Sequence, residues 1–148
     1  MNTTNGIFSA LSDEWRTPES IFKALKKEFP FTLDPCSDGQ NAKVGRYFTR
    51  AENGLLRSWK GETVFLNPPY SEIKKWMAKA YGAARDEGAI VVCLVPSRTD
   101  TDWWHSYALR GEIRFIRGRI RFSDTESNAP FPSAVIIFRP TEFALKSF

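Results

Sequence analysis

Apolar and polar residues follow two different spacings along the chain, and these spacings predict its helices and strands. Apolar positions recur at helical spacing over about residues 18–29 and again over about 71–87. Unbroken apolar runs at 63–66 and 89–95 instead predict strands that are covered on both faces. The remaining predicted strands are 112–122 and 134–138, with shorter ones at 31–33 and 46–49.

The order of these elements predicts an α/β fold. A helix between two buried strands forms a βαβ unit, which makes the two strands parallel neighbours with a right-handed crossover. We therefore expect a small, truncated, doubly wound Rossmann-like sheet that is mostly parallel, with an antiparallel C-terminal strand pair. Residues 1–14 are predicted to be a polar arm. Residues 15–148 are predicted to be a single domain.

The stretch that follows the strand at 63–66 is Asn67-Pro68-Pro69-Tyr70. Two prolines end a strand because neither has an N–H group to donate. The Asn67 side chain and nearby backbone carbonyls are thus presented at the carboxyl end of a strand, where open α/β sheets bind their ligands. A plain proline-rich turn, with Tyr70 as its lid, is the alternative interpretation.

Composition narrows the class of protein. A chain of 148 residues with 42% hydrophobic and 26% charged residues is typical of one soluble globular domain. No apolar run reaches about 20 residues and no signal sequence begins the chain, so we expect a cytoplasmic protein without a membrane partner. Cys36 and Cys93 are expected to be free thiols, and no spacing of His and Cys predicts a metal site.

The net charge of +4 is a mild indication of a polyanionic partner. If residues 116–122 stay extended, Arg117, Arg119 and Arg121 share one face of the strand. Gly118 indicates a bulge or turn within it. Like charges on one face repel, so a nucleic acid explains them better than an ordinary solvated face, which remains the alternative.

Asn67-Pro68-Pro69-Tyr70 resembles the catalytic motif of amino-methyltransferases that use S-adenosylmethionine. Their targets are adenine N6, cytosine N4, guanine N2 or a glutamine amide. In this chemistry the Asn side-chain oxygen and the Pro68 carbonyl each accept one N–H of the target amino group, which aims its lone pair at the methyl group. Tyr70 stacks on a planar substrate.

A longer ordered set of segments resembles the small phage-encoded DNA N6-adenine methyltransferases, from about Trp15 to Phe138. These segments are Trp15-Arg16-Thr17-Pro18, Leu33-Asp34-Pro35-Cys36, Asn53-Gly54-Leu55, Asn67-Pro68-Pro69-Tyr70-Ser71, Pro96 to His105, Gly118-Arg119 and Ala129 to Ser133. The resemblance implies methylation of adenine N6 in DNA, with S-adenosylmethionine as cofactor, as a phage modification against host restriction. It also implies the methyltransferase fold.

The same resemblance assigns cofactor-binding roles. Thr17 and Pro18 correspond to the segment that meets the methionine end of the cofactor, although Thr17 is equally interpreted as the N-cap of the first helix. Asp34, Pro35 and Cys36 correspond to the first cofactor loop, although no Gly-x-Gly follows and an Asx-Pro turn is the alternative. Asn53 stands where an acidic residue contacting the cofactor adenine is usual.

Arg98 and His105 follow the strand at 89–95. Arg98 is predicted to contact substrate phosphate, with a solvated loop charge as the alternative. His105 is expected to pack or lie at the surface, because methyl transfer needs no strong base.

The target adenine must leave the helix to reach Asn67. Methylation of RNA guanine N2 or a protein glutamine amide, and a non-catalytic nucleic-acid-binding module, remain alternatives. Both a monomer and a homodimer are compatible with the sequence.

Overall fold

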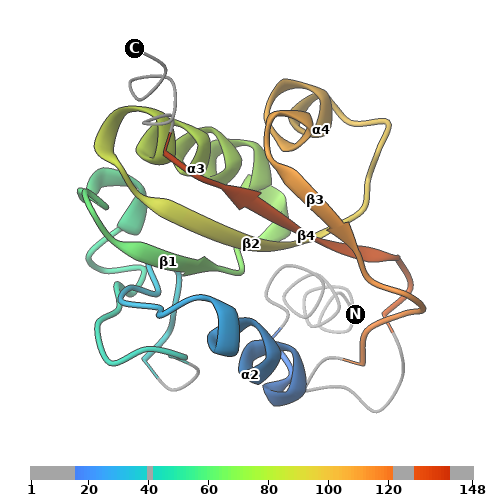
Figure 1. Cartoon of the computed structure of the whole chain (residues 1–148), viewed down its shortest axis with the longest axis horizontal. Helices are drawn as coiled ribbons and strands as arrows, with labels where there is room; N and C mark the ends of the chain where they lie inside the picture. The colour runs from blue at the N-terminus through green and yellow to red at the C-terminus, as the bar shows by residue number, and fades with distance from the viewer. Residues whose placement is uncertain (1–15, 40–41, 122–128, 141–148) are drawn as a thin grey trace, which may run out of the picture.

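A four-stranded sheet forms the centre of the fold in the computed structural model, which describes residues 16–39, 42–121 and 129–140. The strands lie in the order β1-β2-β4-β3 (Figure 1). They are β1 (Thr63–Leu66), β2 (Ile90–Pro96), β3 (Glu112–Phe115) and β4 (Ser133–Phe138). The predicted polar arm at 1–14 lies outside the described residues.

The sheet is mixed, so the prediction of a mostly parallel sheet is confirmed only in part. β1 and β2 are parallel, with Leu66 opposite Cys93. β4 pairs antiparallel with both β2 and β3, which confirms the antiparallel C-terminal pair. Because β4 inserts between β2 and β3, the central strand β2 has a parallel neighbour on one side and an antiparallel one on the other.

Helices cover both faces of this sheet. α3 and α4 lie on one face, and α2 lies on the other (Figure 1). The helical segments are α2 (Glu19–Glu28), α3 (Ile73–Glu87) and α4 (Asp102–Ser106), with short 3₁₀ turns η1 (Gly54–Leu56), η2 (Tyr70–Glu72) and η3 (Ala108–Arg110). None of the described helices is long and apolar enough to cross a membrane.

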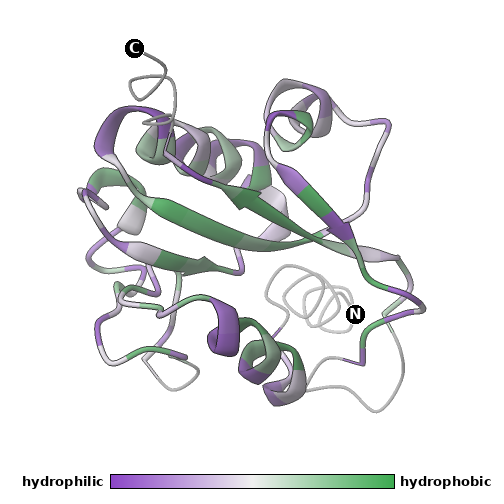
Figure 2. Cartoon of the chain, viewed as in Figure 1, coloured by the Kyte–Doolittle hydropathy of each residue, from purple (hydrophilic) through white to green (hydrophobic). Residues whose placement is uncertain are grey.

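β2 owes its unbroken apolar sequence to these two layers. Val91 and Cys93 belong to the core under α3, whereas Val92 and Leu94 belong to the core under α2. Every second side chain of a strand points to the same face, so a strand that is buried on both sides needs apolar residues throughout. Figure 2 shows β2 and β4 as mainly hydrophobic strands between helices whose outer surfaces are hydrophilic.

α3 begins after the two prolines and ends as the sequence predicts. The turn η2 precedes it, and Glu72 occupies its N-cap position, with no side-chain cap. Its predicted stripe, including Trp76 and Met77, is buried against the sheet. Gly88 closes the helix in the left-handed conformation, with φ +69°, which glycine adopts without steric cost.

Three predicted strands are shorter than expected or absent. Residues 31–33 and 46–49 contribute only the isolated parallel bridges of Leu33 with Val64 and of Asp34 with Tyr47. The strand predicted at 112–122 ends at Phe115. Phe115 lies opposite Ala134, and Ile116 still donates its N–H to the carbonyl of Ser133, the first residue of β4, at 3.1 Å, so β4 offers no partner to the residues after Ile116. Gly118 then adopts φ +74°, which places a turn where the sequence indicated a bulge or turn.

Candidate active site

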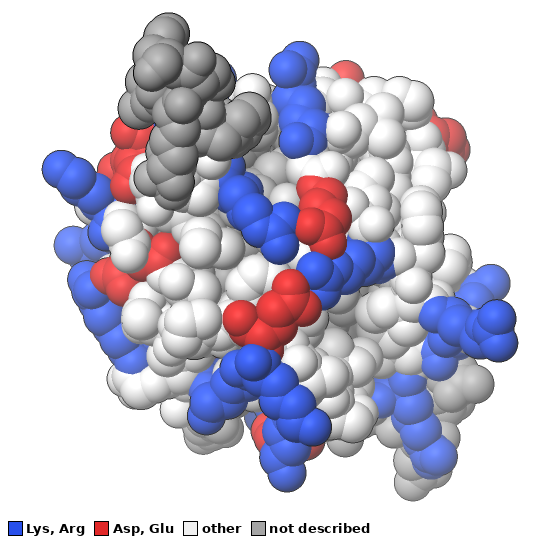
Figure 3. Space-filling view, in the orientation of Figure 1, with Lys and Arg blue, Asp and Glu red and all other residues white. Residues whose placement is uncertain are grey.

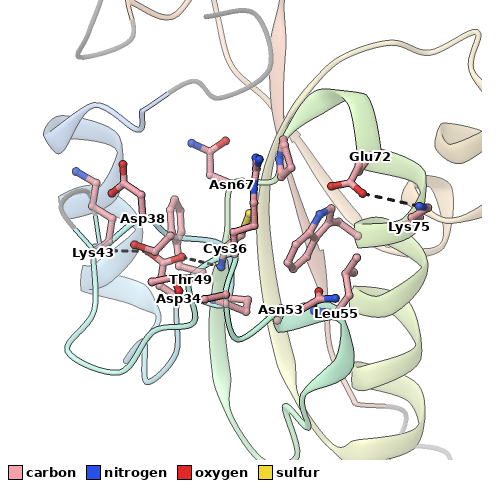
Figure 4. Close-up of a pocket in the computed structure, with 18 of the residues that line it drawn as sticks. Asp34, Cys36, Asp38, Lys43, Thr49, Asn53, Leu55, Asn67, Glu72 and Lys75 are labelled. Atoms are coloured by element: carbon pink, nitrogen blue, oxygen red, sulfur yellow. Dashed lines mark hydrogen bonds and ion pairs between the residues drawn. The ribbon is translucent and has the colours of Figure 1, made fainter. Parts of the chain in front are cut away.

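A pocket of about 890 Å³ opens at the carboxyl end of β1. Its lining comes from segments far apart in the sequence. The segment of Leu33 and Asp34, which forms parallel bridges with Val64 and Tyr47, ends at the same edge of the sheet as β1. Asp34 and Lys43 lie on one side, and Glu72 and Lys75 lie on the other (Figure 4). The pocket therefore has the position that α/β sheets use for ligands.

Asn67 is the first residue after β1, and its side chain lines this pocket. Its Nδ2 donates a hydrogen bond of 2.9 Å to Oγ1 of Thr17, which lies 50 residues earlier in the chain. Thr17 is buried, with 3% of its surface exposed. This contact fixes the plane of the Asn67 amide, and it joins the two segments that the resemblance placed at the cofactor and at the target base. Pro69 also lines the pocket, and Pro68 is buried beside it.

The alternative interpretation of Thr17 as a helix N-cap is wrong. α2 begins at Glu19, and its N-cap position is held by Pro18, with no side-chain cap. Proline has a φ that suits the start of a helix and no N–H to satisfy, so the helix starts without a threonine cap. The Thr17 side chain is directed to Asn67 instead. Pro18 itself does not line the pocket.

Asp34 is a buried carboxylate at the wall of the pocket, with 4% of its surface exposed. The backbone N–H groups of Cys36 and Lys43 donate to its two oxygens at 3.4 and 3.1 Å (Figure 4). Burial nevertheless raises the pKa of Asp34 to about 6, because loss of solvation outweighs these two bonds. The Cys36 bond is the predicted Asx turn, so Asp34 both forms this turn and lines the pocket. A buried carboxylate of this kind favours a cationic ligand.

Two of the predicted cofactor segments, those of Asp34 to Cys36 and of Asn53, meet at Gly54. Asn53 lines the pocket in the left-handed conformation, with φ +54°, and its side chain accepts a hydrogen bond from the Leu55 N–H at 3.2 Å. A Cβ at Gly54 would stand 2.1 Å from the carbonyl oxygen of Pro35. Glycine is thus required here for the close approach of the two loops, and Pro35 and Cys36 line the pocket beside it.

Replacing Gly54 with alanine is expected to lower the free energy of unfolding by about 1–3 kcal/mol, because the new methyl group collides with backbone rather than with a movable side chain. Urea unfolding measures this change. Gly82→Ala is the matched control: nothing lies within 4 Å of its added Cβ, and a helical Gly→Ala change stabilises by about 0.5–1 kcal/mol. Equal unfolding midpoints for the Gly54 variant and the wild type would show that the contact of the two loops is not restrictive.

Tyr70, the last residue of the motif, and Arg98 lie outside the pocket lining. The half-buried Tyr70 ring packs against Phe131 in a T-shaped pair, with ring centroids 5.4 Å apart and planes inclined by 73°. Burial raises the pKa of the Tyr70 phenol, whose oxygen has no hydrogen-bond partner among the described residues. The exposed Arg98 guanidinium lies 5.8 Å from the centre of the Phe131 ring. Phe131 therefore links the loop after β2 to the segment Asn67-Pro68-Pro69-Tyr70.

Arg117, Arg119 and Arg121 are exposed, but they do not share the face of a strand as predicted, since β3 ends at Phe115. None of the three pairs with an acidic side chain in the described part of the chain. Other arginines behave differently: the Arg114 guanidinium binds Glu28 at 2.7 Å, and Arg139 binds Glu112. Figure 3 shows basic side chains without acidic neighbours at the lower right, over the segment that follows β3.

Several pocket residues were not predicted from the sequence. Glu72 and Lys75 form an ion pair of 3.8 Å at the first turn of α3. Trp76 lines the pocket and also belongs to the hydrophobic core. Their position directly after the motif was the available signal, because the first turn of a helix that follows a ligand-binding loop faces the ligand. His105 lies outside the pocket, and its exposed ring makes a 2.8 Å hydrogen bond to the Thr99 carbonyl, as expected for a surface residue. No cluster of three potential metal ligands occurs among the described residues.

Three curated proteins are similar to this chain. The DNA N-6-adenine-methyltransferase of Haemophilus phage HP1 is 26% identical over 151 residues, covering 95% of this chain and 86% of the relative. A putative methyltransferase of Escherichia coli K12, YfdM, is 43% identical over 68 residues, covering 40% of this chain and 74% of the relative. The DNA N-6-adenine-methyltransferase of Escherichia phage T1 is 29% identical over 97 residues, covering 64% of this chain and 40% of the relative.

A family model described as DNA N-6-adenine-methyltransferase (Dam) matches residues 5–144, which is nearly the whole chain. It spans every described helix and strand, from α2 to β4, and all the residues that line the pocket. The chain therefore belongs to the DNA N-6-adenine-methyltransferase (Dam) family and is an enzyme that methylates adenine N6 in DNA.

Proposed function

We propose that the methyl donor is S-adenosylmethionine, that it binds in the pocket at the end of β1, and that Asn67 positions the target amino group. The observation that carries this proposal is the hydrogen bond between Asn67 and Thr17, which brings the motif for the target base into the pocket that holds Asp34. A ligand in that pocket and a base held by Asn67 would be neighbours.

The residues of the pocket fit this cofactor. Its volume of about 890 Å³ lies within the range of small-molecule sites. S-adenosylmethionine carries an ammonium and a sulfonium group, and the buried carboxylate of Asp34 supplies the opposite charge. Asn53 and Leu55 offer a wall of mixed polarity for the adenosine end. When bound, the cofactor supplies an electrophilic methyl group.

Asn67 and Pro68 act on the base. With Nδ2 of Asn67 donating to Thr17, the side-chain oxygen lies on the other branch of the amide, and it accepts one N–H of the adenine amino group. The carbonyl of Pro68 accepts the second. These fixed dipoles favour a pyramidal nitrogen and support the positive charge that develops on it. The proton leaves after the nitrogen has become cationic, so no strong base is required.

Tyr70 is proposed to stack on the extruded adenine. Its ring is half-buried in a T-shaped pair with Phe131, and we propose that the base stacks on a ring face that Phe131 does not cover. Base stacking on an aromatic side chain contributes about 1–3 kcal/mol.

DNA is proposed to lie along the edge of the sheet where these residues meet. Arg98, Arg117, Arg119 and Arg121 are exposed cations on loops near that edge, and we propose that they bind phosphate groups. We propose that residues 15–148 form one domain in which no separate part is set aside for target recognition. The adenine must be extruded from the duplex to reach Asn67.

Transfer of a labelled methyl group tests the donor and the target together. Purified protein is incubated with methyl-labelled S-adenosylmethionine and with DNA, RNA or protein as acceptor. We expect label only in DNA and, after digestion to nucleosides, only in N6-methyldeoxyadenosine. Label in RNA, in protein or on cytosine would contradict the proposal, and a reaction without DNA provides the background.

A further inference from the structure

Phe115 is a large aromatic residue whose ring faces solvent. It is 68% exposed, which is unusual for phenylalanine in a folded domain. One side of the ring is held by the buried Trp104 of α4, with ring centroids 6.4 Å apart and planes inclined by 28°. The contact with Trp104 already restricts the exposed ring. A partner that covers the ring therefore causes little further loss of side-chain entropy.

The position of Phe115 in the sheet places it at the edge that carries the pocket. Phe115 lies opposite Ala134, and Ala134 lies opposite Val95, the next-to-last residue of β2. Asn67 follows β1 at the same carboxyl end. Because β1 and β3 are the two outer strands, three strand spacings, or roughly 15 Å, separate the end of β1 from the end of β3.

Charge around Phe115 indicates what covers the ring. Arg117, Arg119 and Arg121 lie within six residues after it in the chain, are exposed, and have no acidic partner in the described ranges 16–39, 42–121 and 129–140. A symmetric contact with a second copy of this chain would bring two such sets of arginines together, and the repulsion disfavours it. A polyanion neutralises the charges of the arginines, and its binding to them would place it next to Phe115.

We propose that Phe115 is a DNA-contacting residue that stacks on a base of the substrate beside the position that the target adenine leaves. This inference rests on the proposed function. Extrusion of the adenine toward Asn67 leaves an unstacked position in the duplex, and a supported aromatic ring on the same edge supplies a new stacking surface there. The arginines contribute the charge-dependent part of binding, and Phe115 contributes a part that does not depend on charge.

Salt titration of DNA binding separates these two parts. The affinity for a short fluorescein-labelled duplex containing adenines is measured by anisotropy at several salt concentrations, with saturating S-adenosylhomocysteine. Phe115→Ala is expected to weaken binding by about 5- to 150-fold without changing the slope of log affinity against log salt. Joint replacement of Arg117, Arg119 and Arg121 is expected to make that slope shallower, by up to roughly 0.9 for each lost phosphate contact.

Two further variants define the role of the ring. Phe115→Tyr keeps an aromatic face and is expected to bind as the wild type does. Leu109→Ala removes another exposed apolar side chain, 53% exposed, near the opposite end of β3, and is expected to have no effect. The inference is overturned if Phe115→Ala binds DNA like the wild type, if it changes the salt slope as the arginine variant does, or if sedimentation shows that its only effect is to dissociate a dimer. Labelled-methyl transfer to DNA by the same Phe115→Ala preparation, at saturating DNA, shows separately whether the proposed function holds.

Discussion

Replacing Asn67 with alanine is expected to slow methyl transfer to DNA by about 10²–10³-fold, as the loss of one preorganised polar group does at other sites of developing charge. The side chain is the proposed acceptor for one N–H of the target amino group, and nothing else in the motif replaces it. Asn67 is half-buried and follows the last residue of β1, so the strand and the two prolines keep their places. The loss falls on the chemical step.

Single-turnover methylation of an adenine-containing duplex, with each variant saturated in cofactor, measures this step. Asn67→Asp keeps an acceptor oxygen and is expected to retain part of the activity. Thr17→Val removes the partner that orients the amide while keeping the shape of the buried side chain, and it is expected to have an intermediate rate. If Asn67→Ala transfers methyl groups at the wild-type rate, then Asn67-Pro68-Pro69-Tyr70 is a turn and not a catalytic motif.

Replacing Asp34 with alanine is expected to weaken S-adenosylmethionine binding by roughly 10- to 10³-fold, the range for losing a charge-assisted contact in a buried site. The affinity of the wild-type protein is also expected to depend on pH. The pKa of Asp34 is about 6 before a ligand is bound, and a cationic ligand favours the ionised form. Binding therefore releases a proton below this pKa, so the affinity rises as the pH increases through about 6 and is level above it.

Calorimetry at pH values on both sides of 6 measures the affinity and, in buffers of different ionisation enthalpy, the proton release. Asp34→Asn retains the shape of the side chain without its charge, and it is expected to bind weakly with no pH dependence between 5 and 7. An unchanged dissociation constant for Asp34→Ala would remove Asp34 from the site. Unfolding experiments on the same variants show whether the fold has been preserved.

The apolar patterns determined the elements that build the site. The run at 63–66 is β1, and the run at 89–95 is β2 shifted by one residue. The helical stripe between them is α3, which ends at Gly88. These elements are specified locally, by spacing, proline and glycine, so the sequence alone placed Asn67 at the carboxyl end of a strand and Asp34 in a loop near that edge.

Contacts between distant segments could be decided only by the tertiary structure. From the sequence, Thr17 could be interpreted equally well as a helix N-cap or as a residue of the site. Only the path of the chain, which brings Thr17 to Asn67, distinguishes these two interpretations. Arg117, Arg119 and Arg121 alternate with other residues as in a strand, but a strand also needs a partner, and β4 begins at Ser133, which bonds only as far along the chain as Ile116. The place of β4 between β2 and β3 has the same origin, because strand order depends on the packing of the whole sheet rather than on the pattern within any one strand.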